Sequence, residues 1–91
     1  MAFLLFMAAL AGEPAPGAAL YRCLDDTMFT LSATPRVAIV RFADRQYRLP
    51  RRASSLAVKY ANDSATLYLD GDFAAFVADD RPLPGCRRVS N

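Results

Sequence analysis

Turn-forming residues recur about every eight to ten positions from Ala19 onward, and the segments between them are rich in aromatic and β-branched residues. This spacing is typical of short antiparallel strands joined by tight turns. No segment after Ala19 keeps an apolar period of about 3.6 residues over three turns, which argues against helices there. The pattern predicts an all-β fold, namely a small antiparallel β-barrel of about eight short strands. A two-sheet sandwich is the alternative.

We expect strands over residues 20–23, 27–31, 36–42, 45–49, 56–60, 66–69 and 73–77, and a last short strand that carries Cys86. Pro50 is expected to end the fourth of them, because proline has no backbone N–H to donate to a neighbouring strand. Asp70-Gly71 is the strongest signal for a two-residue hairpin loop. The pair Asp79-Asp80 is also expected to form a turn, because an aspartate side chain readily bonds its own backbone.

The first ten residues form an unbroken apolar run that precedes Ala11, Gly12 and Glu13. A helix of about ten residues spans about 15 Å, which is too short to cross a bilayer core of about 30 Å. The small residues Ala9 and Ala11 suit a signal-peptide cleavage site. We therefore predict a signal segment over 1–11, a Pro/Gly linker over 12–18, a folded domain over 19–91, and a periplasmic or secreted location. A helix packed against the domain is the alternative.

The chain has two cysteines, Cys23 and Cys86, near opposite ends of the predicted domain. In a small exported domain such a pair is expected to form one disulfide, with two unpaired buried thiols as the alternative. We do not expect a lipid anchor on Cys23, because the bulky Leu20 and Tyr21 and the charged Arg22 precede it where a lipidation site needs small residues.

The residue inventory limits the chemistry. The chain has no His, which excludes histidine-based catalysis and most metal sites, and its adjacent carboxylates lie in predicted turns. We therefore expect no enzyme activity, no cofactor and no metal. A net charge of +2 is far below that of a dedicated nucleic-acid binder, so we expect no nucleic-acid partner. A small single-stranded nucleic-acid binder is the alternative if the N-terminal run is not a signal.

Several landmarks follow one another in a specific order. These are Tyr21-Arg22-Cys23, Tyr47-Arg48-Leu49, a serine-containing loop that leads into Lys59-Tyr60, the segment from Tyr68 to Ala74, and Cys86. In this order the chain resembles the periplasmic and membrane-bound inhibitors of C-type lysozyme, the MliC/PliC family, from Tyr21 to Cys86. The resemblance implies a small β-barrel closed by a disulfide. It also implies a non-catalytic protein that plugs the active-site cleft of a C-type lysozyme.

That family uses a Ser-Gly-x-Lys/Arg-Tyr loop whose serine faces the catalytic carboxylates of the enzyme. Here Lys59 and Tyr60 match the end of this motif, and an ungapped comparison puts Leu56 at the serine position. Ser54 and Ser55 lie just upstream and could supply the hydroxyl if the loop is shifted. We also expect Tyr60 to be largely buried, because it continues the apolar face of its strand.

The second family motif is a Lys-Gly turn whose lysine faces the same carboxylates. Gly71 and Asp72 match this motif, whereas Asp70 stands where the family has lysine. An anion opposite two carboxylates would oppose binding, unless Asp70 faces solvent as an ordinary turn residue. We expect a positive φ at Gly71. The predicted function is inhibition of C-type lysozyme through Ser54, Ser55, Lys59 and Tyr60, and the alternative is an exported barrel that has lost inhibition and binds another periplasmic ligand or partner.

Overall fold

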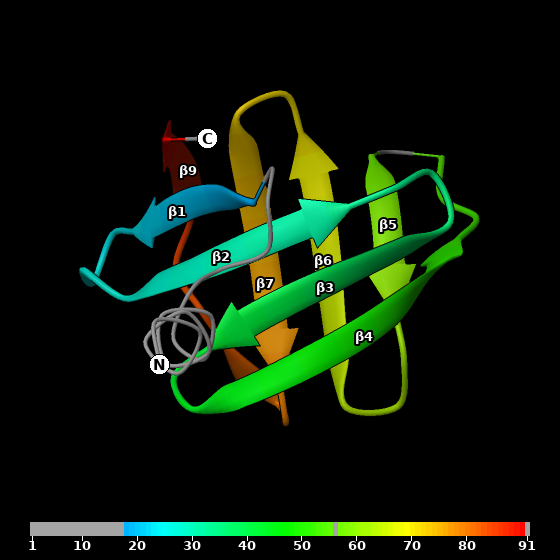
Figure 1. Ribbon diagram of the computed structural model, residues 1–91, viewed down its shortest axis with the longest axis horizontal. Helices are drawn as coiled ribbons and strands as arrows, with labels where there is room; N and C mark the ends of the chain where they lie inside the picture. Colours follow the sequence, from blue (N-terminus) through cyan, green and yellow to red (C-terminus); the bar gives the residue numbers. More distant parts are fainter. Residues whose placement is uncertain (1–17, 56, 91) are drawn as a thin grey trace, which may run out of the picture.

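The computed structural model describes residues 18–55 and 57–90. Nine strands follow one another along this part of the chain (Figure 1): β1 (Ala19–Cys23), β2 (Met28–Ala33), β3 (Val37–Phe42), β4 (Arg45–Arg52), β5 (Val58–Ala61), β6 (Ala65–Asp70), β7 (Phe73–Ala78), β8 (Arg81–Pro82) and β9 (Cys86–Ser90). The described residues contain no helix, which confirms the all-β prediction. None of them therefore belongs to a helix that could cross a membrane. The predicted signal segment and all but the last residue of the predicted linker lie outside the described residues.

The strands close into an eight-stranded antiparallel barrel with one extra strand. Each strand from β1 to β7 pairs with the next, β7 also pairs with β9, and β9 pairs with β1. The extra strand, β8, lies on the same edge of β7 as β9, because it pairs at Val77 and Ala78 whereas β9 pairs at Phe73 and Ala74. Figure 1 shows β2, β3 and β4 crossing in front of β5, β6 and β7. The predicted barrel is confirmed over the sandwich.

A disulfide joins the first and last strands of the barrel. Cys23 and Cys86 lie directly opposite each other in β1 and β9, and their sulfur atoms are bonded. Both side chains are buried. The predicted pairing is confirmed, and the bond closes the barrel covalently where the two ends of the folded chain meet.

The core is built from aromatic rings on the inward positions of the strands. The Tyr21 ring stacks on the Phe29 ring with centroids 5.1 Å apart, and Phe29 lies 5.5 Å from Phe76. Tyr47 and Phe42 meet the Phe76 ring edge-on at 5.6 and 6.0 Å. Phe76 is fully buried and touches rings from three other strands, so it ties together the two crossing groups of strands. Aromatic pairs in these geometries add about 0.5–1.5 kcal/mol each beyond the area that they bury.

The prediction that Pro50 ends its strand was wrong, because β4 continues to Arg52. The backbone N–H of Arg51 donates to the carbonyl of Arg36, just before β3, at 2.8 Å. Successive amides point to opposite edges of a strand, so the nitrogen of Pro50 faces the β5 edge. On that edge β4 pairs only at Arg51 and Arg52. The missing N–H of Pro50 therefore falls where no partner strand needs it.

One predicted turn is shifted by one residue in the structure. Asp70 pairs with Phe73 as the last residue of β6, so the hairpin loop is Gly71-Asp72 rather than Asp70-Gly71. Gly71 has a φ of +60°, as predicted, and this is the first central position, where a type II′ turn requires glycine. Asp79-Asp80 forms a turn, as predicted, and the two-residue strand β8 begins directly after it at Arg81.

Candidate functional site

The two ends of the barrel carry different connections, because successive turns of an antiparallel barrel alternate between its ends. One end carries the connections 34–36, 53–57 and 71–72, together with the start of β1 and the end of β9. We call it the motif end, because both segments that resemble the lysozyme-inhibitor motifs contribute to it. The opposite end carries the connections 24–27, 43–44, 62–64 and 79–80.

The first motif divides between an exposed connection and a strand. Ser54 and Ser55 are exposed in the connection between β4 and β5, whereas Leu56 lies outside the described residues. Lys59 is half-buried in β5, on the outer surface of the barrel, and its Nζ lies 5.5 Å from the centroid of the Tyr68 ring. The ring face attracts the ammonium group and holds it against the wall of the barrel.

Tyr60 belongs to the core. Its side chain is 4% exposed, and its hydroxyl donates to the carbonyl oxygen of Thr34 at 2.7 Å. The Arg51 guanidinium lies 5.7 Å from the centroid of its ring. The predicted burial of Tyr60 is confirmed. Its hydrogen bond links β5 to the 34–36 turn and so holds two connections of the motif end together.

The second motif forms the tip of the β6–β7 hairpin. Asp70, Gly71 and Asp72 are all exposed, and the carbonyl of Asp72 accepts a hydrogen bond from the backbone N–H of Arg88 at 2.8 Å. This bond fixes the tip of the hairpin to β9.

The fold brings the two motif segments to neighbouring positions. Strands β5 and β6 pair antiparallel, with Val58 opposite Leu69 and Lys59 opposite Tyr68. The connection that carries Ser54 and Ser55 therefore enters β5 beside the position where β6 leaves for the Gly71 turn. Serine hydroxyls, a lysine and a hairpin tip with two carboxylates lie around one end of one barrel.

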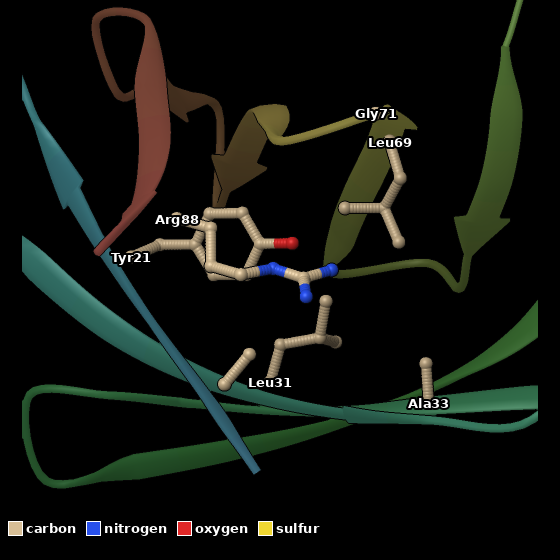
Figure 2. A pocket seen from close by; sticks show the side chains of 7 residues that line it. Tyr21, Leu31, Ala33, Leu69, Gly71 and Arg88 are labelled. Carbon is tan, nitrogen blue, oxygen red and sulfur yellow. The ribbon is translucent and has the colours of Figure 1, made fainter. Parts of the chain in front are cut away.

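A hollow of about 190 Å³ opens at the motif end between β1, β2, β6 and β9. We call it the mouth hollow; its lining includes Tyr21, Leu31, Ala33, Leu69, Gly71 and Arg88. Figure 2 shows the Arg88 side chain passing the Tyr21 ring and extending its guanidinium into the hollow, toward Leu31 and Leu69. The lining combines apolar side chains, among them Leu31 and Leu69, with polar groups that include this guanidinium and the Tyr21 hydroxyl.

The charge of Arg88 is held in place by its neighbours. A hydrogen bond with the Tyr21 side chain and, to a lesser extent, the negative charge of Asp72 raise the pKa of Arg88 above its ordinary value. Its Nε lies 3.9 Å from Oδ1 of Asp72, and both side chains reach solvent. An ion pair that is this long and this exposed contributes little stability. The arrangement thus holds a permanent cation in the mouth hollow, next to the apolar side chains of Leu31 and Leu69.

A second hollow, of about 310 Å³, lies at the opposite end beside Arg45, Tyr47 and Asp79. Here the polar groups bind one another: Arg45 contacts Oδ2 of Asp79 at 2.8 Å, and the Tyr47 hydroxyl donates to the same oxygen at 3.2 Å. The guanidinium is therefore already matched by a carboxylate at hydrogen-bond distance. This internal pairing makes the opposite end the weaker candidate for a binding site.

The sequence reasoning missed Arg88 and Tyr21 as site residues. Arg88 lies two positions after the buried Cys86, so the alternation of a strand puts both side chains on the inward face. That spacing could have marked Arg88 as a charged residue at an inward position. Tyr21 and the Gly71 turn lie next to Arg88 only because strands distant in sequence pair with one another, which the sequence alone does not show.

Within residues 18–55 and 57–90, no three His, Cys, Asp or Glu side chains gather closely enough to hold a metal ion. Comparisons of the chain with protein-family models, with curated proteins and with solved structures find no match.

Proposed function

We propose that this protein is a non-catalytic inhibitor of C-type lysozyme that covers the active-site cleft of the enzyme with its motif end. The observation that carries the proposal is the position of the two motif segments. They are separate in sequence, yet the pairing of β5 with β6 brings them side by side at one end of the barrel. A surface that covers a cleft needs such a cluster of connections on a rigid support.

The exposed hydroxyls of Ser54 and Ser55 are the groups that this proposal assigns to the enzyme. C-type lysozyme cleaves its substrate with two carboxyl groups, and hydroxyl or ammonium donors can bind both. Lys59 is beside them on β5 and adds positive charge to the contact. Tyr60 supports the connection from the core instead of binding the enzyme, because its hydroxyl bonds Thr34.

Export to an oxidising compartment is part of the same proposal. The buried Cys23–Cys86 disulfide supports a periplasmic or secreted location, since such bonds persist where thiols are not kept reduced. With its sulfur in that bond, Cys23 has no thiol to carry a lipid.

The charge of the hairpin tip predicts weak inhibition. Asp70 and Asp72 are both exposed at the motif end, and carboxylates that face the carboxyl groups of the enzyme repel them. Asp70→Lys should therefore lower the inhibition constant against a C-type lysozyme by at least about tenfold, which corresponds to about 1.4 kcal/mol. The gain should shrink as salt is raised, because ions screen exposed charges.

Asp63→Lys is the matched control, because it makes the same charge change at an exposed position of the opposite end. It should leave the inhibition constant unchanged. Equal effects of the two substitutions would show a non-specific attraction to the enzyme and contradict the assigned surface. A wild-type chain that shows no inhibition, and an Asp70→Lys variant that gains none, would leave the alternative of a barrel that binds another periplasmic ligand or partner.

A further inference from the structure

We propose that the mouth hollow is a binding site for a monocarboxylate that carries a short apolar group. The inference does not require lysozyme inhibition, because it concerns a small ligand bound by Arg88 and Tyr21, although the Gly71 turn borders both sites. It rests on the juxtaposition of Arg88, the Tyr21 hydroxyl and the apolar side chains of Leu31 and Leu69 in one hollow at the end of the barrel.

The charge of the site selects an anion. A planar guanidinium binds a carboxylate through two parallel N–H donors, and a phenol hydroxyl beside it can donate to the same group. Figure 2 shows the Arg88 guanidinium reaching into the hollow next to the Tyr21 oxygen, so both donors converge on one region. Asp72, whose Oδ1 is 3.9 Å from Nε of Arg88, disfavours a second negative charge. The site therefore favours a single carboxylate over a phosphate dianion.

The walls and the volume select a short apolar group. Leu31 and Leu69 flank the end of the guanidinium, and Ala33 leaves space beside them. A volume of about 190 Å³ is ample for a small ligand, since about 10–15 Å³ on the same measure already holds one water molecule. The hollow therefore admits butyrate, or the terminal residue of a peptide that ends in a small apolar side chain.

Contacts on both sides of Arg88 fix the arrangement of the site. Its backbone N–H donates to the carbonyl of Asp72 at 2.8 Å, which fixes β9 to the hairpin tip. Tyr21 is 1% exposed, and its ring stacks on Phe29. A ligand therefore meets donors that are already oriented, which reduces the entropy lost on binding.

The probes are butyrate and butyramide, which share a shape and a number of non-hydrogen atoms but differ in charge. Titration of the full-length protein, followed through backbone amide shifts in NMR, should give saturable changes with butyrate at Tyr21, Leu31, Leu69 and Gly71. The dissociation constant of so small a ligand should be of the order of 10 mM. Butyramide should bind at least about tenfold more weakly, because the charge-assisted bonds are lost.

Three variants test the assignment. Arg88→Gln should weaken butyrate binding at least about tenfold. The control Arg87→Gln makes the same charge change one position away, where the side chain lies over the Phe73 ring outside the barrel, and should bind as the wild type does. Ala33→Phe should fill the hollow and abolish binding while Arg88 remains, which keeps the test decisive if Arg88→Gln fails to fold.

Acetyl-alanyl-alanine and its C-terminal amide test whether the natural ligand is a peptide C-terminus or a free short-chain acid. Tighter binding of this peptide acid than of butyrate, with loss in the amide, would assign the site to peptide C-termini. Weaker binding of the peptide would assign it to free short-chain acids. Absence of saturable shifts at the mouth hollow, equal binding of butyrate and butyramide, or equal losses in Arg87→Gln and Arg88→Gln would overturn the proposal.

Discussion

Breaking the Cys23–Cys86 bond should remove a large part of the stability of the domain. The bonded residues are 63 positions apart, and closing a loop of that length in the unfolded chain lowers its entropy by an amount worth about 4 kcal/mol at 25 °C. A domain of about seventy residues has a net stability of about 4–10 kcal/mol. The reduced protein should therefore show a ratio of folded to unfolded molecules about a thousand times lower than the oxidised protein.

Urea denaturation of the oxidised and the reduced wild type measures this difference with identical side chains in both samples. The Cys23→Ala/Cys86→Ala variant should lose slightly more stability than the reduced wild type, because both side chains are buried and the substitution also removes packed volume. A loss below about 1 kcal/mol on reduction would refute the reasoning. It would mean that the reduced unfolded chain already keeps β1 and β9 close together.

Three other substitutions, one of them with a matched control, test separate features of the fold. Tyr60→Phe should lower the free energy of unfolding by about 1 kcal/mol and leave lysozyme inhibition unchanged, because the Tyr60 hydroxyl donates to Thr34 of the same chain. A tenfold loss of inhibition would instead show that Tyr60 contacts the enzyme. Ala43 has a φ of +57°, a backbone conformation that glycine adopts more easily than alanine, so Ala43→Gly should stabilise the protein by up to about 1 kcal/mol in thermal denaturation. The control Ala61→Gly lies within strand β5 and should destabilise the protein in the same measurement. Hydrogen bonds with the Thr27 side chain and, second, with its backbone N–H lower the pKa of Asp25 below the ordinary 3.8. The contribution of Asp25 to stability is therefore present above that pH and is lost as the pH falls further. Asp25→Asn should therefore lose less stability than the wild type between about pH 5 and pH 2, and parallel loss in both proteins would contradict this assignment.

The strands could be predicted because each of them buries alternate residues. Phe29 and Leu31 are both buried, as their spacing of two requires, and the same alternation places Tyr60 in the core. The effect of Pro50 was predicted wrongly, because the energetic cost of a proline in a strand depends on whether the neighbouring strand needs a backbone N–H at that position. That requirement is a property of strand pairing and cannot be seen locally in the sequence. The loop at Gly71 was misplaced by one residue because Asp-Gly and Gly-Asp both satisfy a two-residue hairpin.

The candidate site was only partly predictable. The order of the motifs identified the segments around Ser54 and Gly71, and the pairing of β5 with β6 then brought them together. Alternation with the buried Tyr60 puts Lys59 on the outer wall, but the sequence did not show that its ammonium group lies against Tyr68, because that ring comes from another strand. Arg88 was missed for a similar reason, since its role depends on Tyr21, which lies at the other end of the domain.

The disulfide also determines how the folded protein responds to a pulling force on its two ends. Among the described residues, only 18–22 and 87–90 lie outside the covalent ring closed by Cys23 and Cys86, so stretching can release at most about 30 Å of this part of the chain. Beyond that length the tension passes through the sulfur–sulfur bond and bypasses β2 to β8. In the reduced protein the same force would reach every strand in turn and extend the whole chain. The oxidised barrel should therefore stay folded under tension that unravels its reduced form.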